Sequence, residues 1–246
     1  MMNRSKRVGA LFAKALAAGV LMATAGLAQA LPVSGQGTWE TTLQARDLNG
    51  DTITDAFYDT ALNITWLRNA SENGLMNWNV ANFWANSLSF GGYTDWRLPT
   101  MVDTGTSGCN FSFAGGTDCG YNVQTATSEM AHLFHETLGN LSAFDTAGVV
   151  RGGPSGVNWG LANTGEFENM QSFAYWSGLE YAPLASDAWY FNAVAGNQGN
   201  ALKTIAWYAL AVRPGDVVAA VPEPESLALV LVGLVAAGVA RRRRPL

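Results

Sequence analysis

The sequence lacks the short motifs that mark most nucleotide-dependent enzymes and hydrolases. It contains no glycine-rich phosphate loop, no dinucleotide-binding glycine motif, no GxSxG nucleophile elbow and no HExxH zinc motif. No arrangement of histidine with a nucleophile and a carboxylate is evident either. We therefore expect a protein that is not an enzyme and that needs no cofactor.

Histidine is scarce, and its spacing argues against a metal centre. The chain has two histidines, His132 and His135, followed by Glu136. A zinc protease needs histidines at i and i+4 around a glutamate, whereas these are three residues apart. At about 100° per residue they fall opposite the apolar stripe of a helix, so we expect a solvent-exposed polar face.

Cysteine is limited to Cys109 and Cys119. The pair has no CxxC spacing, which argues against a redox centre. In an exported chain two cysteines this close in sequence are expected to form a disulfide.

The N-terminus reads as a secretory signal peptide over residues 1–30. Basic residues precede an apolar run over residues 15–27, and the segment ends in the small-x-small pattern Ala28-Gln29-Ala30. This order predicts cleavage after Ala30.

The C-terminus, residues 217–246, has an equally ordered pattern. Pro222-Glu223-Pro224 precedes an apolar run over residues 227–240, and the basic residues Arg241, Arg242, Arg243 and Arg244 follow. As a helix this run would rise about 21 Å, which is short of the roughly 30 Å hydrocarbon core of a bilayer. It therefore predicts a short or transient transmembrane helix, with the arginines on the cytoplasmic side.

These C-terminal features resemble the PEP-CTERM sorting signal. The resemblance implies recognition and removal of the tail by exosortase, a membrane-embedded protease. It also implies export to the outer surface, envelope or extracellular matrix of a Gram-negative bacterium that makes exopolysaccharide.

Positive charge is scarce in the remaining body, residues 31–216. It has seventeen acidic and six basic residues, a net charge of −11, although the whole chain carries −5. So acidic a body argues against nucleic acid and polyanionic partners. Tryptophan, tyrosine, asparagine and glycine are abundant, which is typical of an extracellular module rich in loops.

The first part of the body predicts short strands. Residues 38–47 alternate apolar and polar side chains, Asn49-Gly50 indicates a hairpin turn, and residues 56–59 and 60–67 continue the pattern. The turn has oxygen ligands at alternating positions, as a calcium loop does: Asp47, Asn49, Asp51 and Asp55. Its glycine is at the fourth position rather than the sixth, and Tyr58 replaces the usual glutamate, so a plain hairpin is the competing interpretation.

Two helices follow. Residues 76–90 are expected to be helical with Asn77 as the N-cap, and their apolar stripe is Val80, Phe83, Trp84, Ser87 and Leu88. A second helix is expected from Thr127 or Ser128, with its own stripe of Met130, Leu133, Phe134, Leu138 and Leu141.

Between the helices lies Asp95-Trp96-Arg97-Leu98-Pro99-Thr100. Trp96 and Leu98 can face one core, Pro99 favours an extended chain, and Arg97 calls for a carboxylate or carbonyl partner. Together with Tyr58-Asp59-Thr60 and the threonine-tryptophan pair at residues 65–66, this stretch resembles the Lcl C-terminal domain family, and more distantly the formylglycine-generating-enzyme-like family.

The resemblance implies a C-type-lectin-like α+β fold, with two main helices and small twisted antiparallel sheets. Residues 101–126 depart from the family pattern as an insertion that carries the cysteines. Because both cysteines lie in the insertion, the formylglycine-enzyme activity is not implied.

The last part of the body combines loops and aromatic strands. A glycine- and asparagine-rich stretch over residues 144–170 precedes strands expected at 172–178, 188–192 and 205–215. The candidate ligand-binding aromatics are Trp159, Trp176, Trp189 and Tyr190. We expect a lectin-like module for glycan or protein in a biofilm setting; the alternatives are a structural envelope protein and a polysaccharide hydrolase with two convergent carboxylates.

Overall fold

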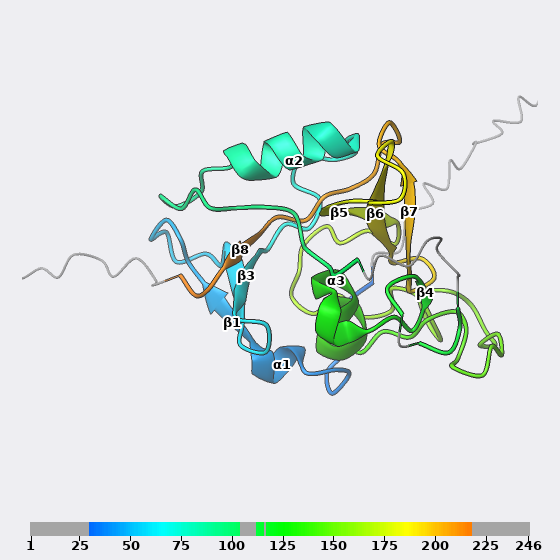
Figure 1. Ribbon diagram of the computed structural model, residues 1–246. Coiled ribbons are helices and arrows are strands. Elements are labelled where there is room, and N and C mark those ends of the chain that lie inside the picture. Colours follow the sequence, from blue (N-terminus) through cyan, green and yellow to red (C-terminus); the bar gives the residue numbers. More distant parts are fainter. Residues whose placement is uncertain (1–29, 104–111, 116, 218–246) are drawn as a thin grey trace, which may run out of the picture.

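The structure is a computed structural model that describes residues 30–103, 112–115 and 117–217. Two four-stranded antiparallel sheets organise this part of the chain, in the strand orders β1-β2-β3-β8 and β4-β7-β6-β5. The first sheet consists of β1 (Leu43–Arg46), β2 (Ala56–Asp59), β3 (Ile64–Leu67) and β8 (Val212–Pro214). The second consists of β4 (Gly120–Tyr121), β5 (Ala174–Glu180), β6 (Asp187–Asn192) and β7 (Asn197–Leu202). Figure 1 shows the two sheets on opposite sides of the molecule, with α2 (Trp78–Ser87) across the top.

Helical segments fill the space between the sheets. The helix α3 (Glu129–His132) continues directly into the π-helical turn η2 (Leu133–Thr137). Its side chains Met130, Leu133 and Phe134 share one buried cluster with Phe57 of the first sheet and Phe191 of the second. The core is therefore continuous from sheet to sheet, and α3 is its centre, as Figure 1 indicates.

A buried carboxylate fixes the turn between β2 and β3. Asp59 is fully buried and accepts N–H bonds from Ala61, Leu62 and the Trp66 indole, at 3.0, 3.3 and 3.4 Å. Thr137 of η2 approaches the same carboxylate at 3.5 Å. A buried charge is costly unless its oxygens are hydrogen-bonded, so these donors are what make Asp59 tolerable there.

The extended stretch over residues 95–100 joins the two sheets. The backbone of Arg97 exchanges hydrogen bonds with Val212 of β8 at 2.8 and 2.9 Å. The carbonyl of Pro99 accepts bonds from the Gly178 amide and the Ser177 hydroxyl of β5 at 2.8 and 3.0 Å. Trp96 and Leu98 are buried, as their spacing predicted.

Helix α2 is shorter than expected, and its predicted apolar stripe is only partly confirmed: Trp84 and Leu88 pack against the core, whereas Val80 and Phe83 do not. Asn77 does cap it, accepting the Val80 amide at 3.0 Å. However, Phe83 is 75% exposed and Val80 47%, while the small Ala81 and Ala85 are buried. These alanines lie against Leu98, Trp176 and Ala188. Trp78 and Trp84 of the same helix pack against this cluster as well and remain partly exposed.

In the second helix the predicted cap is confirmed, but the prediction that both histidines lie on a solvent-exposed face is wrong for His135. Ser128 accepts the Ala131 amide at 3.3 Å. In η2 the wider π turn breaks the 100° spacing on which the prediction depended. His135 is consequently drawn inward, between the rings of Phe134 and Phe191 at 4.9 and 5.9 Å, and it is not a solvent-exposed polar residue.

The observed strands differ from the predicted ones in three places. Residues Trp39–Thr42 form a helical turn, α1, before β1 begins at Leu43. Strand β7 was not predicted, because its residues Asn197–Leu202 are mostly polar or small. The described part of the 101–126 insertion contributes β4, which pairs with β7 as an edge strand of the second sheet. A mixed α and β fold with few helices and antiparallel sheets is thus confirmed.

Candidate functional site

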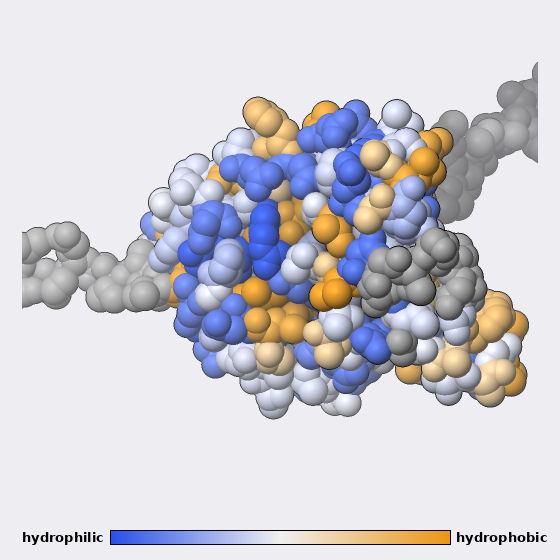
Figure 2. All heavy atoms as spheres, in the orientation of Figure 1, coloured by the Kyte–Doolittle hydropathy of each residue, from blue (hydrophilic) through white to orange (hydrophobic). Residues whose placement is uncertain are grey.

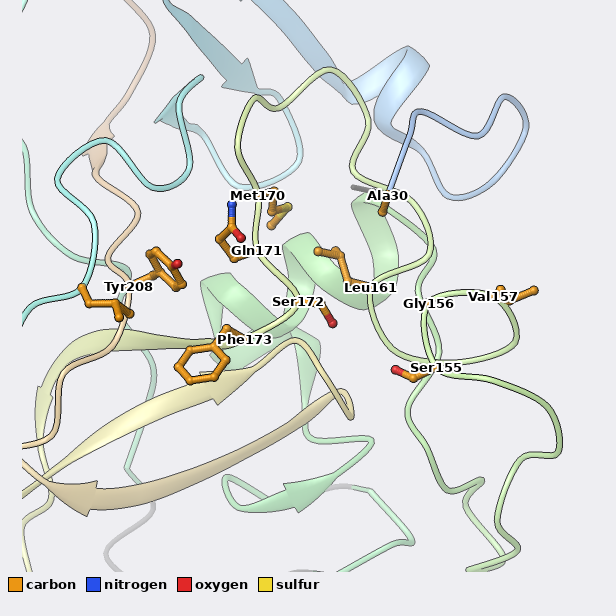
Figure 3. A pocket seen from close by; sticks show the side chains of 11 residues that line it. Ala30, Ser155, Gly156, Val157, Leu161, Met170, Gln171, Ser172, Phe173 and Tyr208 are labelled. Carbon is orange, nitrogen blue, oxygen red and sulfur yellow. The ribbon is translucent and has the colours of Figure 1, made fainter. Parts of the chain in front are cut away.

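A cavity of about 540 Å³ opens where the second sheet meets the loops before it. One wall is formed by Phe173, just before β5, and by Tyr208, whose chain runs beside β5. Their rings meet edge to face, with centroids 6.0 Å apart. The opposite wall comes from the loop over residues 155–161, as Figure 3 shows. The remaining lining residues are Ala30, Leu75, Met170, Gln171 and Ser172.

Hydrogen bonds to the backbone hold this wall in place. The Gln171 amide donates to the hydroxyl of the buried Tyr175 at 2.6 Å, and the Phe173 carbonyl accepts from Ala193 at 2.9 Å. Burial raises the pKa of Tyr175, so its hydroxyl stays protonated. On the other side Ser155 donates to the Val194 carbonyl at 3.1 Å. The cavity is therefore preformed on one side by the sheet and on the other by an anchored loop.

The chemistry of the lining suits an uncharged ligand with an apolar face. Among the described residues that line the cavity there is no carboxylate, imidazole or basic group. Ser172 and the Tyr208 hydroxyl make no hydrogen bond within the described part of the chain, so both are free to contact a ligand.

A second, more polar cavity of about 700 Å³ lies beside the first. It contains Arg68, Glu166 and Glu168, and Ala30 lines both cavities. Arg68 and Glu168 form an ion pair at 2.8 Å. Glu166 and Glu168 thus line one cavity together.

The four aromatics proposed as sugar platforms do not form this site. Trp176 and Trp189 are 0% and 1% exposed, so the prediction that they face outward is wrong. Trp176 instead donates its indole N–H to the Met76 carbonyl at 2.9 Å. Tyr190 is half-buried against Trp207, and Trp159 is held in its own loop by a 3.0 Å bond to the Gly153 carbonyl. None of the four lines the cavity.

The sequence did indicate where to look, but not which residues. Phe173 and Tyr208 lie within segments expected to be aromatic strands, and residues 155–161 lie within the long loop. Strand alternation cannot separate a core aromatic from one at a cavity rim when both faces of a sheet are covered.

Residues 95–100, the signature stretch of the family resemblance, have a structural role that depends on two ion pairs. Arg97 forms a two-pronged bond with Glu129 of α3, both prongs at 2.7 Å, as its predicted need for a carboxylate required. Thr100 donates its amide to the same glutamate at 2.7 Å. Asp95 holds Arg213 of β8 at 2.7 and 3.0 Å, and this guanidinium keeps the pKa of Asp95 below its usual range. The stretch thus connects β8 and α3 and does not point into either cavity.

The loop over residues 47–55 is a closed turn held by its own side chains. Asp47 accepts the amides of Asn49, Gly50 and Thr52, and Asn49 accepts that of Asp51. Although burial opposes the effect, these backbone N–H bonds lower the pKa of Asp47. Asp51 accepts the Ile53 amide and Asp55 that of Leu48. In the described part of the chain, no group of three or more histidine, cysteine, aspartate or glutamate residues is arranged to hold a metal.

Comparison with known families identifies the C-terminal segment. Residues 220–244 match the family model of the PEP-CTERM protein-sorting motif. The chain carries a PEP-CTERM sorting motif. This motif indicates an exported, envelope-associated protein that is processed by exosortase. The motif covers about a tenth of the chain and does not assign the body to a family. No curated protein and no solved structure matches the chain.

Several predictions fall outside the described residues. They are the signal peptide, Cys109, the sorting residues Pro222, Glu223 and Pro224, the apolar helix at 227–240 and the arginine tail. Cys119 itself is buried. Across the residues that the structure does describe, no helix has the length and apolar character to span a bilayer.

Proposed function

We propose that this chain is a recognition protein that exosortase sorts to the envelope or extracellular matrix of a Gram-negative bacterium. The PEP-CTERM motif at residues 220–244 supports the sorting step. The cavity lined by Phe173 and Tyr208 supports the recognition step, because it combines a preformed apolar wall with uncommitted hydroxyl groups. The body acts as a lectin-like module, and its α+β fold with antiparallel sheets is compatible with a C-type-lectin-like architecture.

The ligand of the cavity is a neutral glycan or an uncharged side chain of a protein. Sugars present one apolar face and several hydroxyl groups, which match an aromatic wall and nearby polar groups. The absence of ionisable acid–base pairs among the lining residues supports a binding role over a catalytic one. No cofactor is needed for this role.

A glycan array with the mature exported protein, with and without calcium, tests the recognition step. Phe173→Ala removes the aromatic wall and is expected to lower the affinity for any ligand found by about tenfold. Leu184→Ala is the matched control, because Leu184 is 52% exposed and does not line either cavity. A protein that binds no glycan under any condition would contradict the lectin-like role and favour a structural envelope protein.

The second cavity supports one rival function, hydrolysis of matrix polysaccharide. Glu166 and Glu168 share that cavity, and glycoside hydrolysis needs two carboxylates about 5–9.5 Å apart. Release of reducing ends from exopolysaccharide, abolished by Glu166→Gln, would establish the hydrolase. Unchanged polymer after prolonged incubation would remove it.

A further inference from the structure

In the described part of the body, the ion pairs leave one cation without a carboxylate partner. Five of its six basic side chains are held by carboxylates: Arg46 by Asp216, Arg68 by Glu168, Arg97 by Glu129, Lys203 by Glu180 and Arg213 by Asp95. Three of these cations also lie over aromatic rings, of Tyr58, Trp78 and Tyr93. The sixth cation is Arg151, and within the described residues it forms no ion pair. In a body with seventeen acids and six bases, an unpaired arginine is unexpected.

The backbone fixes Arg151 at the base of a small hairpin over residues 143–151. Its amide donates to the Ala143 carbonyl at 2.8 Å, and Phe144 pairs with Val150 one residue further out. The one acid of this hairpin, Asp145, is engaged at the tip, where it accepts the amides of Ala147 and Val149 at 2.9 Å each. The local carboxylate is thus used to close the turn and is not paired with the arginine.

The guanidinium has one covered and one open end. Its Nε atom is buried and has no hydrogen-bond partner. The two Nη atoms are not among the buried unpartnered atoms, so they reach the surface. A buried guanidinium N–H without an acceptor is costly, and such a group in a folded protein calls for an explanation.

The positive charge of Arg151 also affects a neighbouring histidine, His135. The Nδ1 atom of His135 lies 3.0 Å from the Asn140 carbonyl, and its Nε2 atom is buried without a partner. Burial lowers the pKa of His135, and the charge of Arg151 acts in the same direction, against the opposing effects of the Asn140 and Gly196 carbonyls and of Glu136.

The surface beside Arg151 is apolar rather than acidic. Val149 and Val150 are each 61% exposed, and Val157 is 68% exposed. Figure 2 shows apolar surface on the lobe at the lower right, where the light-green loops of Figure 1 lie. The carboxylate of the hairpin, Asp145, is bound to backbone amides at its tip, so it does not neutralise the charge of Arg151.

We propose that Arg151 is the anchor of a binding site for an isolated carboxylate group, at the base of the hairpin over residues 143–151. A guanidinium binds a carboxylate with two parallel N–H bonds, which is the geometry that its open end offers. The net charge of −11 disfavours a densely charged polyanion, so the ligand carries its carboxylates sparsely. Arg151 does not line the neutral cavity, although the neighbouring Val157 does, so the site adds a carboxylate-binding subsite next to that cavity.

Titration of the full mature protein with glucuronate, N-acetylglutamate and glucose tests this site. The readout is the ¹⁵N–¹H signal of the Arg151 Nε–H group together with calorimetric affinity at low ionic strength. Glucuronate or N-acetylglutamate is expected to shift the signal, and glucose is not. The first probe represents an acidic sugar and the second an acidic side chain, so their relative affinities identify the source of the carboxylate.

Matched variants separate a specific site from a general effect of charge. Arg151→Gln is expected to weaken carboxylate binding by about tenfold or more, and Arg151→Lys by less, because lysine keeps the charge but loses the fork. Arg46→Gln removes the same charge from a paired site and is expected to leave binding unchanged. Equal losses in the Arg46 and Arg151 variants would overturn the proposal, as would a wild-type Nε–H signal that no carboxylate shifts. Retained binding at the cavity of Phe173 together with lost carboxylate binding would show that the two sites are separate.

Discussion

At the residue scale, a few charged side chains account for how distant parts of the chain are held together. The sequence indicated that Arg97 needed a carboxylate or carbonyl partner but could not identify Glu129, which is thirty-two positions away. Likewise Asp95 finds Arg213 across 118 positions. Such partners depend on the packing of elements that local sequence does not specify.

Loss of the Arg97–Glu129 pair is expected to destabilise the fold measurably. Glu129→Gln leaves the half-buried guanidinium with a neutral acceptor, and we expect a loss of about 2 kcal/mol in the free energy of unfolding. Glu168→Gln is the control, because its pair with Arg68 is more exposed and is expected to contribute about 0.5 kcal/mol. Urea denaturation measures both. Equal effects would show that the signature stretch has no special structural role.

His135 is expected to make stability depend on pH. Its pKa is lowered in the folded state, so below the ordinary value of about 6.5 the unfolded chain binds a proton that the folded chain does not. The free energy of unfolding should therefore fall from pH 7 toward pH 5, with a slope of at most about 1.4 kcal/mol per pH unit from this group.

The variant His135→Gln should flatten that dependence, whereas His132→Gln should preserve it. Thermal unfolding followed across the same pH range provides the measurement. A His135 variant with the wild-type slope would show that other groups produce the effect.

At the scale of elements, helix caps and buried strands could be predicted, whereas helix faces and polar strands could not. Asn77 and Ser128 cap their helices as local chemistry requires. The exposure of Phe83 and the strand conformation of β7 could not be predicted, because the neighbouring elements in the fold determine both. β7 exists because β4 and β6 supply hydrogen bonds on both sides, although its own residues favour loops.

The corrected face of α2 can be tested by a pair of substitutions. Phe83→Ala is expected to change the free energy of unfolding by less than about 0.5 kcal/mol, because the ring is exposed. Ala85→Leu is expected to cost about 1–3 kcal/mol, because it forces a larger side chain against the buried cluster that contains Leu98 and Trp176. Chemical denaturation of both variants is decisive. If the Phe83 variant proved the less stable, the helix would lie on its other face.

For the candidate site, too, the local sequence predicted the segments involved, but the residues that line the cavity depend on how distant segments pack. The long loop and the aromatic segments around it were expected to carry function, and residues 155–161 with Phe173 and Tyr208 do line the main cavity. Trp176 and Trp189 were poor candidates because both are covered, Trp176 by the cluster that includes the alanines of α2 and Trp189 by a cluster of Met101, Cys119 and Tyr181. Arg151 could not be found from sequence at all, because its distinction is the lack of a partner.

At the scale of the whole molecule, the role of the C-terminus and the role of the body are inferred from different kinds of evidence. The C-terminal motif is recognised from its own sequence order and needs no fold. The body has antiparallel sheets, a polar acidic surface and a preformed neutral cavity, and its ligand depends on the tests above. Sorting is therefore the claim on which the proposed function depends most directly, because recognition at the cell surface requires it.

Intact-mass spectrometry of the native protein, recovered from the envelope or medium of the producing bacterium, tests sorting most directly. The account predicts a chain that begins at Leu31 and ends near Pro222, Glu223 and Pro224, without Arg241, Arg242, Arg243 and Arg244. A Glu223→Ala variant should retain the tail, because exosortase would no longer recognise its motif. A native exported protein that still carries the four arginines would contradict the account.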